Sequence, residues 1–157
     1  ARQVLLVRGA DGARMGIHLS NVIRLERLPL AGIERIGRRY AVQYRGEIMS
    51  LADTETEPVD THGSPPYLDR ILAEEGDRRK EQTDVVVCSS NNRNIGLVVD
   101  KILDVAYQPI EVQGESTRPG VSGTAVIQNL ITELLDVDYF IASVAAHAGI
   151  PNEDADV

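Results

Sequence analysis

Ile95-Gly-Leu-Val-Val-Asp-Lys-Ile-Leu-Asp-Val105 is the stretch of this sequence that decides the fold. Every second residue, counted from the first, is apolar with a single lysine as the exception, and the positions between them are mixed. A period of two predicts a β-strand with one buried and one partly wet face. A helix would bring Asp100 and Asp104 onto one face, where like charges repel each other. Gly96 has no side chain, which is typical of a bulge or of a close approach to the backbone.

Short apolar segments with turn signals between them lie on both sides of this stretch and predict a mainly β fold. One predicted hairpin joins residues 124–127 to 130–135 and turns at Gln128-Asn129. Many short strands of this kind are typical of a small barrel or sandwich. The other expected strands comprise residues 3–8, 15–19, 22–28, 39–44, 47–51 and 85–89.

Two helices are expected. Ser64-Pro65 is a helix-start signal, because a capping side chain is followed by a residue whose missing N–H does no harm there. This signal predicts a short connector helix at about residues 65–75. A C-terminal helix at about residues 139–148 is expected to be capped by Asp136 or Asp138.

The length of 157 residues predicts one domain. Residues 53–63 are acidic and Thr-rich and residues 77–84 are rich in charge, and we interpret residues 53–83 as a connector between two lobes. Lobe 1 is expected at about residues 2–52 and lobe 2 at about residues 84–150, and terminal strands can exchange between the lobes. No apolar run approaches the ~20 residues that a membrane span needs, so no insertion into a membrane is expected.

The charge is distributed unevenly along the chain. The net charge is −8, yet residues 1–50 carry nine Arg against four acidic residues, a charge of +5. The remainder carries seven basic and twenty acidic residues, a charge of −13. Such asymmetry indicates complementary faces for protein partners. Nucleic-acid binding is not expected, since a binder of that class usually carries a concentrated Lys/Arg stripe.

The polar residues form no recognisable catalytic or metal-binding set, so no cofactor, metal or enzymatic activity is expected. Asp100 and Asp104 are two carboxylates without the further oxygen ligands that a hard cation needs, and pairing with Arg or capping of turns is expected for them instead. The single cysteine, Cys88, lies in an apolar run and is interpreted as an inert core thiol, which fits a reducing cytosol. The three histidines show no metal-ligand spacing. They are His18, His62 and His147.

Three ordered segments give the chain a resemblance to the CheW-like domain family of bacterial chemotaxis. Gln43-Tyr-Arg-Gly-Glu-Ile-Met resembles the Arg-Gly turn of the family, which leads into an apolar strand. The stretch from Ile95 to Val105 is similar to a strand pair of its second lobe. Two parts of the third segment resemble the closing hairpin of the family and the entry to its last helix. They are Arg118-Pro-Gly-Val-Ser-Gly-Thr-Ala-Val-Ile-Gln and Thr132-Glu-Leu-Leu-Asp-Val. The likeness covers about residues 2–52 and 84–145.

Within the family, the sequence motifs are most similar to those of the C-terminal regulatory domain of the chemotaxis histidine kinase CheA. The phrases that resemble this branch are Gln43-Tyr-Arg-Gly, Asp100-Lys-Ile-Leu-Asp and Gly123-Thr-Ala-Val-Ile-Gln. The sequence departs from the family at Ser50, where Pro is usual, and in residues 53–83, which are long and unlike the usual connector. The strand exit at Ser50 and the junction of the lobes are therefore not defined by the resemblance.

The resemblance implies two SH3-like five-stranded β-barrel lobes side by side, and a scaffold rather than a catalyst. It implies binding to a CheW-type coupling protein by barrel-to-barrel contact and to the helical cytoplasmic tip of chemoreceptors between the lobes. It also implies that receptor state is relayed to the kinase domain of the same chain, in the cytoplasm, at receptor arrays near the inner membrane.

Six residues are candidates for partner contact. Arg45 corresponds to the turn Arg of the family, placed near the receptor and partner groove, and the alternative is an ion pair with a nearby acid such as Glu47. Gly46 is expected to serve the backbone shape of that turn. Leu25 and Arg27 share a face of their strand that borders the implied receptor groove, and core burial is the alternative for Leu25. Two apolar candidates for barrel pairing, each with core burial as its alternative, are Ile102 and Val105.

Two other functions are compatible with the sequence. The chain can be a free-standing CheW-type coupling protein, and kinase motifs immediately before Ala1 would decide in favour of the regulatory domain. A small β-barrel hydrolase would need His18, an Asp and either Ser20 or Ser122 to converge within hydrogen-bond reach.

Overall fold

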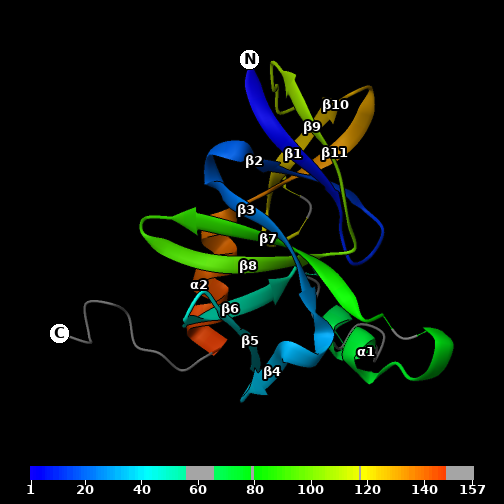
Figure 1. The fold of residues 1–157 in the computed structure, drawn as a ribbon. Coiled ribbons are helices and arrows are strands. Elements are labelled where there is room, and N and C mark those ends of the chain that lie inside the picture. The colour runs from blue at the N-terminus through cyan, green and yellow to red at the C-terminus, as the bar shows by residue number, and fades with distance from the viewer. Residues whose placement is uncertain (56–65, 79, 117, 148–157) are drawn as a thin grey trace.

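A computed structural model describes residues 1–55, 66–78, 80–116 and 118–147. Within these residues it contains eleven β-strands in two sheets and two α-helices, so the predicted mainly β fold is confirmed. Figure 1 shows one sheet above the other, with α2 beside the lower one and α1 at its edge. Neither helix is both long and apolar enough to cross a membrane.

The first sheet has five strands and the second has six (Figure 1). The two sheets and two helices agree with the expected two-lobed fold, although within the described residues neither strand order closes into a barrel. The five-stranded sheet has the order β10 (Val121–Ile127), β11 (Leu130–Leu135), β2 (Arg14–His18), β1 (Arg2–Arg8) and β9 (Lys101–Gln108). The six-stranded sheet has the order β3 (Val22–Pro29), β7 (Gln82–Ser90), β8 (Arg93–Val99), β6 (Glu47–Asp53), β5 (Arg39–Tyr44) and β4 (Ile33–Ile36).

The sheets exchange strands between the two halves of the chain. β1 and β2, from the N-terminus, lie in the sheet of β9, β10 and β11, whereas β7 and β8 lie in the sheet of β3 to β6. The boundaries of the sheets are therefore not the sequential boundaries 2–52 and 84–150. The β1–β9 ladder, with Leu5 opposite Val105, makes the N-terminal strand a structural part of the C-terminal half.

The stretch 95–105 forms two strands rather than one. β8 ends at Val99, β9 begins at Lys101, and the two belong to different sheets. β8 is buried on both faces, which explains its continuous apolar run. β9 is a mostly exposed strand at the edge of the five-stranded sheet. An added Cβ on Gly96 would meet Leu51 Cδ2 at 2.6 Å, so the predicted close approach at this glycine is confirmed.

Three apolar cores hold the sheets and helices together. A shared core lies between the two sheets and contains residues of β1, β2, β7, β8 and α2, among them Leu5, Val86 and Val99. The inner core of the six-stranded sheet is completed by α1 through Tyr67, Leu68 and Ile71. The inner core of the five-stranded sheet is lined by residues that include Val4, Leu6, Ala106, Ala125, Ile127 and Leu134. Because the shared core uses both halves of the chain, neither sheet buries its apolar face alone.

Side chains connect β9 to the β10–β11 hairpin, where the sheet order is open. Gln108 Nε2 donates a hydrogen bond to the Val126 carbonyl at 3.1 Å, and its Oε1 accepts one from the Gln128 backbone N–H at 3.0 Å. Gln128 Nε2 donates in turn to Asp104 Oδ2 at 3.1 Å. These side-chain hydrogen bonds join β9 to the β10–β11 hairpin, a link that backbone pairing between β9 and β10 would otherwise provide.

Both helices begin at carboxylate groups. Asp136 Oδ1 accepts the backbone N–H of Asp138 at 3.1 Å and so caps α2 (Val137–His147), as predicted. α1 (Tyr67–Ala73) is shorter than the predicted 65–75, and the predicted cap Ser64 lies outside the described residues. The Leu68 N–H of α1 is met instead by Asp53 Oδ2 of β6, at 3.4 Å. At the departure from the family pattern, Ser50 lies within β6 and accepts a hydrogen bond from Arg39.

Candidate functional site

Four of the six candidate residues lie at the margin of the shared core, between the two sheets. Leu25 stands opposite Val86 and therefore shares its face of the six-stranded sheet. Val105 stands opposite Leu5 and shares its face of the other sheet. Val86 and Leu5 both belong to the shared core. We call the set comprising Leu25, Arg27, Ile102 and Val105 the inter-sheet rim.

One carboxylate connects the two sides of the inter-sheet rim. Asp84 Oδ1 pairs with Arg27 Nε at 3.1 Å, and Asp84 Oδ2 accepts the backbone N–H of Ile102 at 3.3 Å. The Arg27 side chain remains 68% exposed in this pair, whereas that of Asp84 is 14% exposed. The ion pair therefore holds the Nε side of the Arg27 guanidinium and leaves much of the side chain accessible to a partner.

The apolar members of the rim differ in exposure. Leu25 is 46% exposed and Val105 is 44% exposed, so the structure does not give either the core burial that was the alternative. Ile102 is partly buried and packs against the shared core, so it is a weaker candidate for contact. Tyr107, two residues beyond Val105 on the same face, is 72% exposed.

The Arg45-Gly46 pair forms the tip of the β5–β6 hairpin. Both residues have positive φ, 53° for Arg45 and 81° for Gly46, as a two-residue type I′ turn requires. The Arg45 guanidinium lies over the Tyr44 ring at 5.6 Å from its centroid, in place of the ion pair with Glu47 that was the alternative. An added Cβ on Gly46 would meet nothing within 4 Å, so glycine is favoured here by the positive φ of the backbone and not by steric crowding.

The hairpin tip and the inter-sheet rim lie on opposite faces of β3. The Tyr44 hydroxyl donates a hydrogen bond to Glu26 Oε1 at 3.0 Å, which ties the hairpin to β3. Glu26 alternates with Leu25 and Arg27 along the strand, so its side chain points to the other face. The six candidates therefore form two groups, the inter-sheet rim and the Arg45-Gly46 tip, joined through one edge strand.

The two aspartates of the 95–105 stretch have structural partners. Asp100 lies at the β8–β9 corner and pairs with Arg8 at 2.6 Å and with Lys80 at 3.0 Å. Burial raises the pKa of Asp100, but these two cations outweigh it and hold the pKa below its usual value. The hydrogen bond from Gln128 and that from the Val105 backbone N–H lower the pKa of Asp104. Pairing with Arg is thus confirmed for Asp100, whereas Asp104 pairs with a glutamine.

The Arg118 segment has a structural task as well. The Arg118 side chain is 9% exposed, and its guanidinium pairs with Asp11 of the β1–β2 turn at 2.7 Å and with Glu133 of β11 at 2.9 Å. It thereby holds the loop before β10 against two other parts of the five-stranded sheet. Cys88 is fully buried, and burial raises the pKa of its thiol to about 12, which confirms the interpretation as an inert core thiol.

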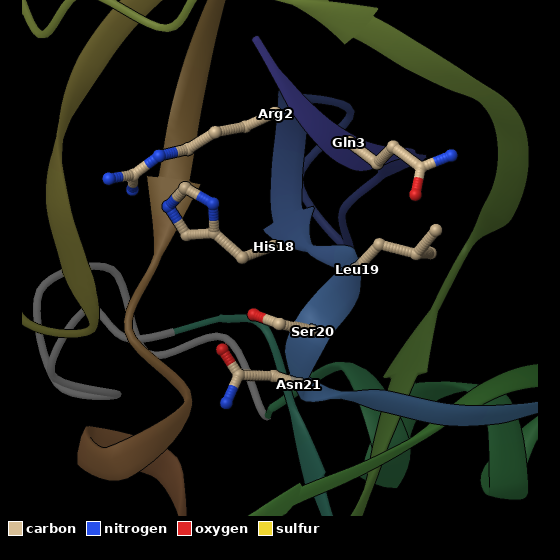
Figure 2. A pocket seen from close by; sticks show the side chains of 6 residues that line it. All are labelled: Arg2, Gln3, His18, Leu19, Ser20 and Asn21. Atoms are coloured by element: carbon tan, nitrogen blue, oxygen red, sulfur yellow. The ribbon is translucent and has the colours of Figure 1, made fainter.

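The hydrolase alternative finds no support in the arrangement of its residues. His18 and Ser20 line one open hollow (Figure 2), but no hydrogen bond joins them, and its described lining contains no carboxylate. Ser122 Oγ instead donates to the Leu134 carbonyl at 3.3 Å. Across the described ranges no three side chains of His, Cys, Asp or Glu gather as a metal site would need, and His62 lies outside those ranges.

Three residues of the site were not predicted from the sequence. Tyr107 was detectable, because it continues the two-residue period beyond Val105. Asp84 and Glu26 have no local signal that marks them, since their importance comes from contacts with Ile102 and Tyr44, which are distant in sequence.

The fold and the exposed rim define a class of protein, a two-sheet β domain with apolar side chains exposed at the margin between its sheets. The model of the CheW-like domain family matches residues 65–145, just over half of the chain, and the chain belongs to this family. Comparison with curated proteins gives no match. The fold is similar to that of the scaffolding protein TtCheW from Thermoanaerobacter tengcongensis, with a TM-score of 0.61 at 15% identity over 86% of this chain and 88% of the other.

Proposed function

We propose that this chain is a non-catalytic adaptor domain of chemotaxis signalling, and that residues 1–157 act as one CheW-like unit. Its partners are a CheW-type coupling protein and the cytoplasmic tip of chemoreceptors, and its place is the cytoplasm at receptor arrays. The observation that supports this most is the family match over residues 65–145, on a two-sheet fold that exposes five of the six predicted contact residues.

The inter-sheet rim suits a helical partner. Leu25 and Val105 offer apolar area from two sheets, and Arg27 offers a cation whose position is held by Asp84. A receptor tip is a helical hairpin by the resemblance, and an amphipathic helix binds through a row of apolar anchors flanked by polar contacts. Tyr107 extends the apolar area, and tyrosine is a residue type enriched at interfaces.

The Arg45 tip suits a second contact. A type I′ turn favours Asn or Gly at its first central position, and Arg45 occupies it with φ at 53°. An unfavourable backbone conformation that is retained points to a use for the side chain. The planar guanidinium can bind a carboxylate or the carbonyl groups at a helix C-terminus of a partner.

Titration of the folded chain with a CheW-type coupling protein and with a chemoreceptor tip fragment tests the proposal. We expect saturable binding, and we expect Arg45→Asn to weaken the binding of one of these partners about tenfold. The variant is expected to fold normally, because Asn suits the turn better than Arg does. Arg38→Ala, at an exposed arginine in the neighbouring β4–β5 turn, is the matched control and should bind as the natural chain does. Failure of both partners to bind the folded chain would reject the proposal.

We further propose the regulatory domain of the kinase CheA as the particular member of the family, and the free-standing coupling protein is the second candidate. The phrases around Arg45, Asp100 and Gly123 support the kinase branch. Determination of the coding sequence upstream of Ala1 tests the choice. Kinase ATP-binding motifs there support the regulatory domain, which would then act on a kinase domain in cis, and their absence supports the coupling protein.

A further inference from the structure

A hollow with several polar side chains in its lining lies at the start of β1, at the open end of the inner core of the five-stranded sheet. It has a volume of about 570 Å³, within the ~300–1,000 Å³ range of small-ligand sites. Its described lining comes from β1, from the last residue of β2 and from the β2–β3 connection. The lining residues are Arg2, Gln3, His18, Leu19, Ser20 and Asn21.

The strand register places the Arg2 and His18 side chains on one face. His18 stands opposite Val4 in the β1–β2 ladder, and Arg2 is two residues before Val4 on the same strand. Figure 2 shows the Arg2, His18 and Ser20 side chains on one side of the strands and Gln3 and Leu19 on the other. The positive charge of Arg2 is also one of the two causes, after burial, that lower the pKa of His18.

Three polar side chains that line this hollow have no partner among the described residues. In the part of the chain that the structure describes, neither a hydrogen-bond nor an ion-pair partner is found for Arg2, His18 or Ser20. The contrast is Asn21, whose amide donates to the Ser89 carbonyl at 3.1 Å. Among the described lining residues Arg2 is the one charged side chain besides the titratable His18, so this part of the hollow is cationic although the chain carries a net charge of −8.

We propose that this hollow binds a carboxylate, with Arg2 as its ionic partner and with His18 and Ser20 as hydrogen-bond donors. A guanidinium presents a planar fork that matches the two oxygens of a carboxylate. A neutral imidazole and a hydroxyl each supply one donor. One arginine balances one negative charge, and the net charge of −8 disfavours an anion with more charge than that. The site is separate from the inter-sheet rim, because Arg2 and His18 face the inner core.

The carboxylate can belong to a small free molecule or to an acidic side chain of a protein segment, and two probes separate these sources. Sodium acetate represents the free carboxylate. The capped peptide acetyl-Ala-Glu-Ala-amide represents the side chain, and the same peptide with Gln is its neutral control. The imidazole resonances of His18 report binding by NMR at constant ionic strength, and those of His62 and His147 serve as internal references.

We expect saturable shifts of the His18 resonances with the Glu peptide and a higher pKa of His18 in its presence, because a nearby anion favours the charged imidazole. Arg2→Gln should weaken binding about tenfold, as loss of a charged hydrogen bond does. Arg24→Gln, an exposed arginine on β3, should leave binding within about twofold.

Binding of acetate as well as the peptide identifies free carboxylates as ligands, and binding of the peptide alone identifies an acidic protein segment. No saturable shift with either probe would overturn the proposal. Equal binding of the Gln peptide, or equal losses in Arg2→Gln and Arg24→Gln, would overturn it too. The experiment contains no chemotaxis protein, so its outcome is independent of the proposed adaptor function.

Discussion

Tyr44 holds the hairpin tip in place through two contacts at once. Its hydroxyl donates to Glu26 on β3, and its ring lies beneath the Arg45 guanidinium. The side chain also packs against the inner core of the six-stranded sheet. The position of Arg45 is therefore determined by its neighbour in sequence and by a carboxylate on another strand.

Removal of the Tyr44 hydroxyl separates these two contacts. Tyr44→Phe keeps the ring and loses the hydrogen bond to Glu26, so we expect the free energy of unfolding to fall by about 1 kcal/mol. Urea unfolding followed by circular dichroism measures this. Tyr107→Phe is the control, because Tyr107 is 72% exposed, and it should change stability by less than about 0.5 kcal/mol. Equal effects of the two substitutions would contradict the role of the Tyr44–Glu26 contact.

Asp53 predicts a pH dependence with a definite sign. Burial raises its pKa from 3.8 to about 6, against the opposing effect of the hydrogen bonds from the Glu55 and Leu68 backbone N–H groups. A carboxyl with a raised pKa in the folded state stabilises the protein below its unfolded pKa, and this contribution is lost as pH rises through the folded value. A full shift of this size corresponds to about 3 kcal/mol, and partial exposure reduces it, so we expect about 1–2 kcal/mol.

The measurement compares the natural chain with Asp53→Asn between pH 4 and pH 6.5. Other carboxylates titrate in both proteins, so the difference between the two curves isolates Asp53. We expect the natural chain to lose stability relative to the variant as pH rises across this window. Parallel curves would show that Asp53 has an ordinary pKa.

At the scale of the elements, β9 performs three tasks along its eight residues. Its first residues meet Asp84 of the six-stranded sheet, its middle residues expose Val105 and Tyr107, and its last residue holds the β10–β11 hairpin. A β-bulge opposite Leu6 and Val7 lies between the first task and the second. A bulge changes the direction of side chains along a strand, and here it lets Ile102 and Val105 face the same side.

Gln108 is the residue through which β9 holds the hairpin. Gln108→Ala should leave the β10–β11 ladder intact but expose the Gln128 backbone N–H, whose amide exchange we expect to accelerate about tenfold. Hydrogen exchange followed by NMR measures this. Gln43→Ala, an exposed glutamine on β5, is the control and should leave that amide unchanged. Unchanged exchange in Gln108→Ala would show that the hairpin is held by other contacts.

The whole molecule depends on the core between the sheets. Val99 is fully buried there, at the end of β8. Val99→Asp places an unpaired carboxylate in this core, so we expect loss of both sheets in one cooperative step and more than about 3 kcal/mol of destabilisation. Thermal unfolding by circular dichroism measures it. Val112→Asp, at a 58% exposed valine, should melt as the natural chain does. A native-like melting curve for Val99→Asp would contradict the burial of this strand.

The parts of this architecture that were predictable from sequence are the local ones. The Gln128-Asn129 turn and the Asp136 cap depend on residues within a few positions of each other, and both occur as expected. An exchange of terminal strands was expected, but its pairing partners were not defined, because pairing of β1 with β9 depends on contacts about a hundred residues apart in the chain. The period-two pattern of the 95–105 stretch combined a doubly buried strand with an edge strand, so it concealed the corner at Asp100.

The same distinction applies to the candidate site. Leu25 and Arg27 could be placed on one face from alternation alone. Their proximity to Ile102 through Asp84, and the position of Arg45 on the other face of β3, are tertiary facts that alternation does not contain.

The inter-sheet rim is the surface that we propose for a chemotaxis partner. Its most direct test is backbone amide NMR of the chain during titration with a chemoreceptor tip fragment. We expect perturbations concentrated at Leu25, Arg27, Val105 and Tyr107, with the outer residues of β4 as an unaffected reference. Perturbations confined to other surfaces, or none at saturating fragment, would contradict the claim.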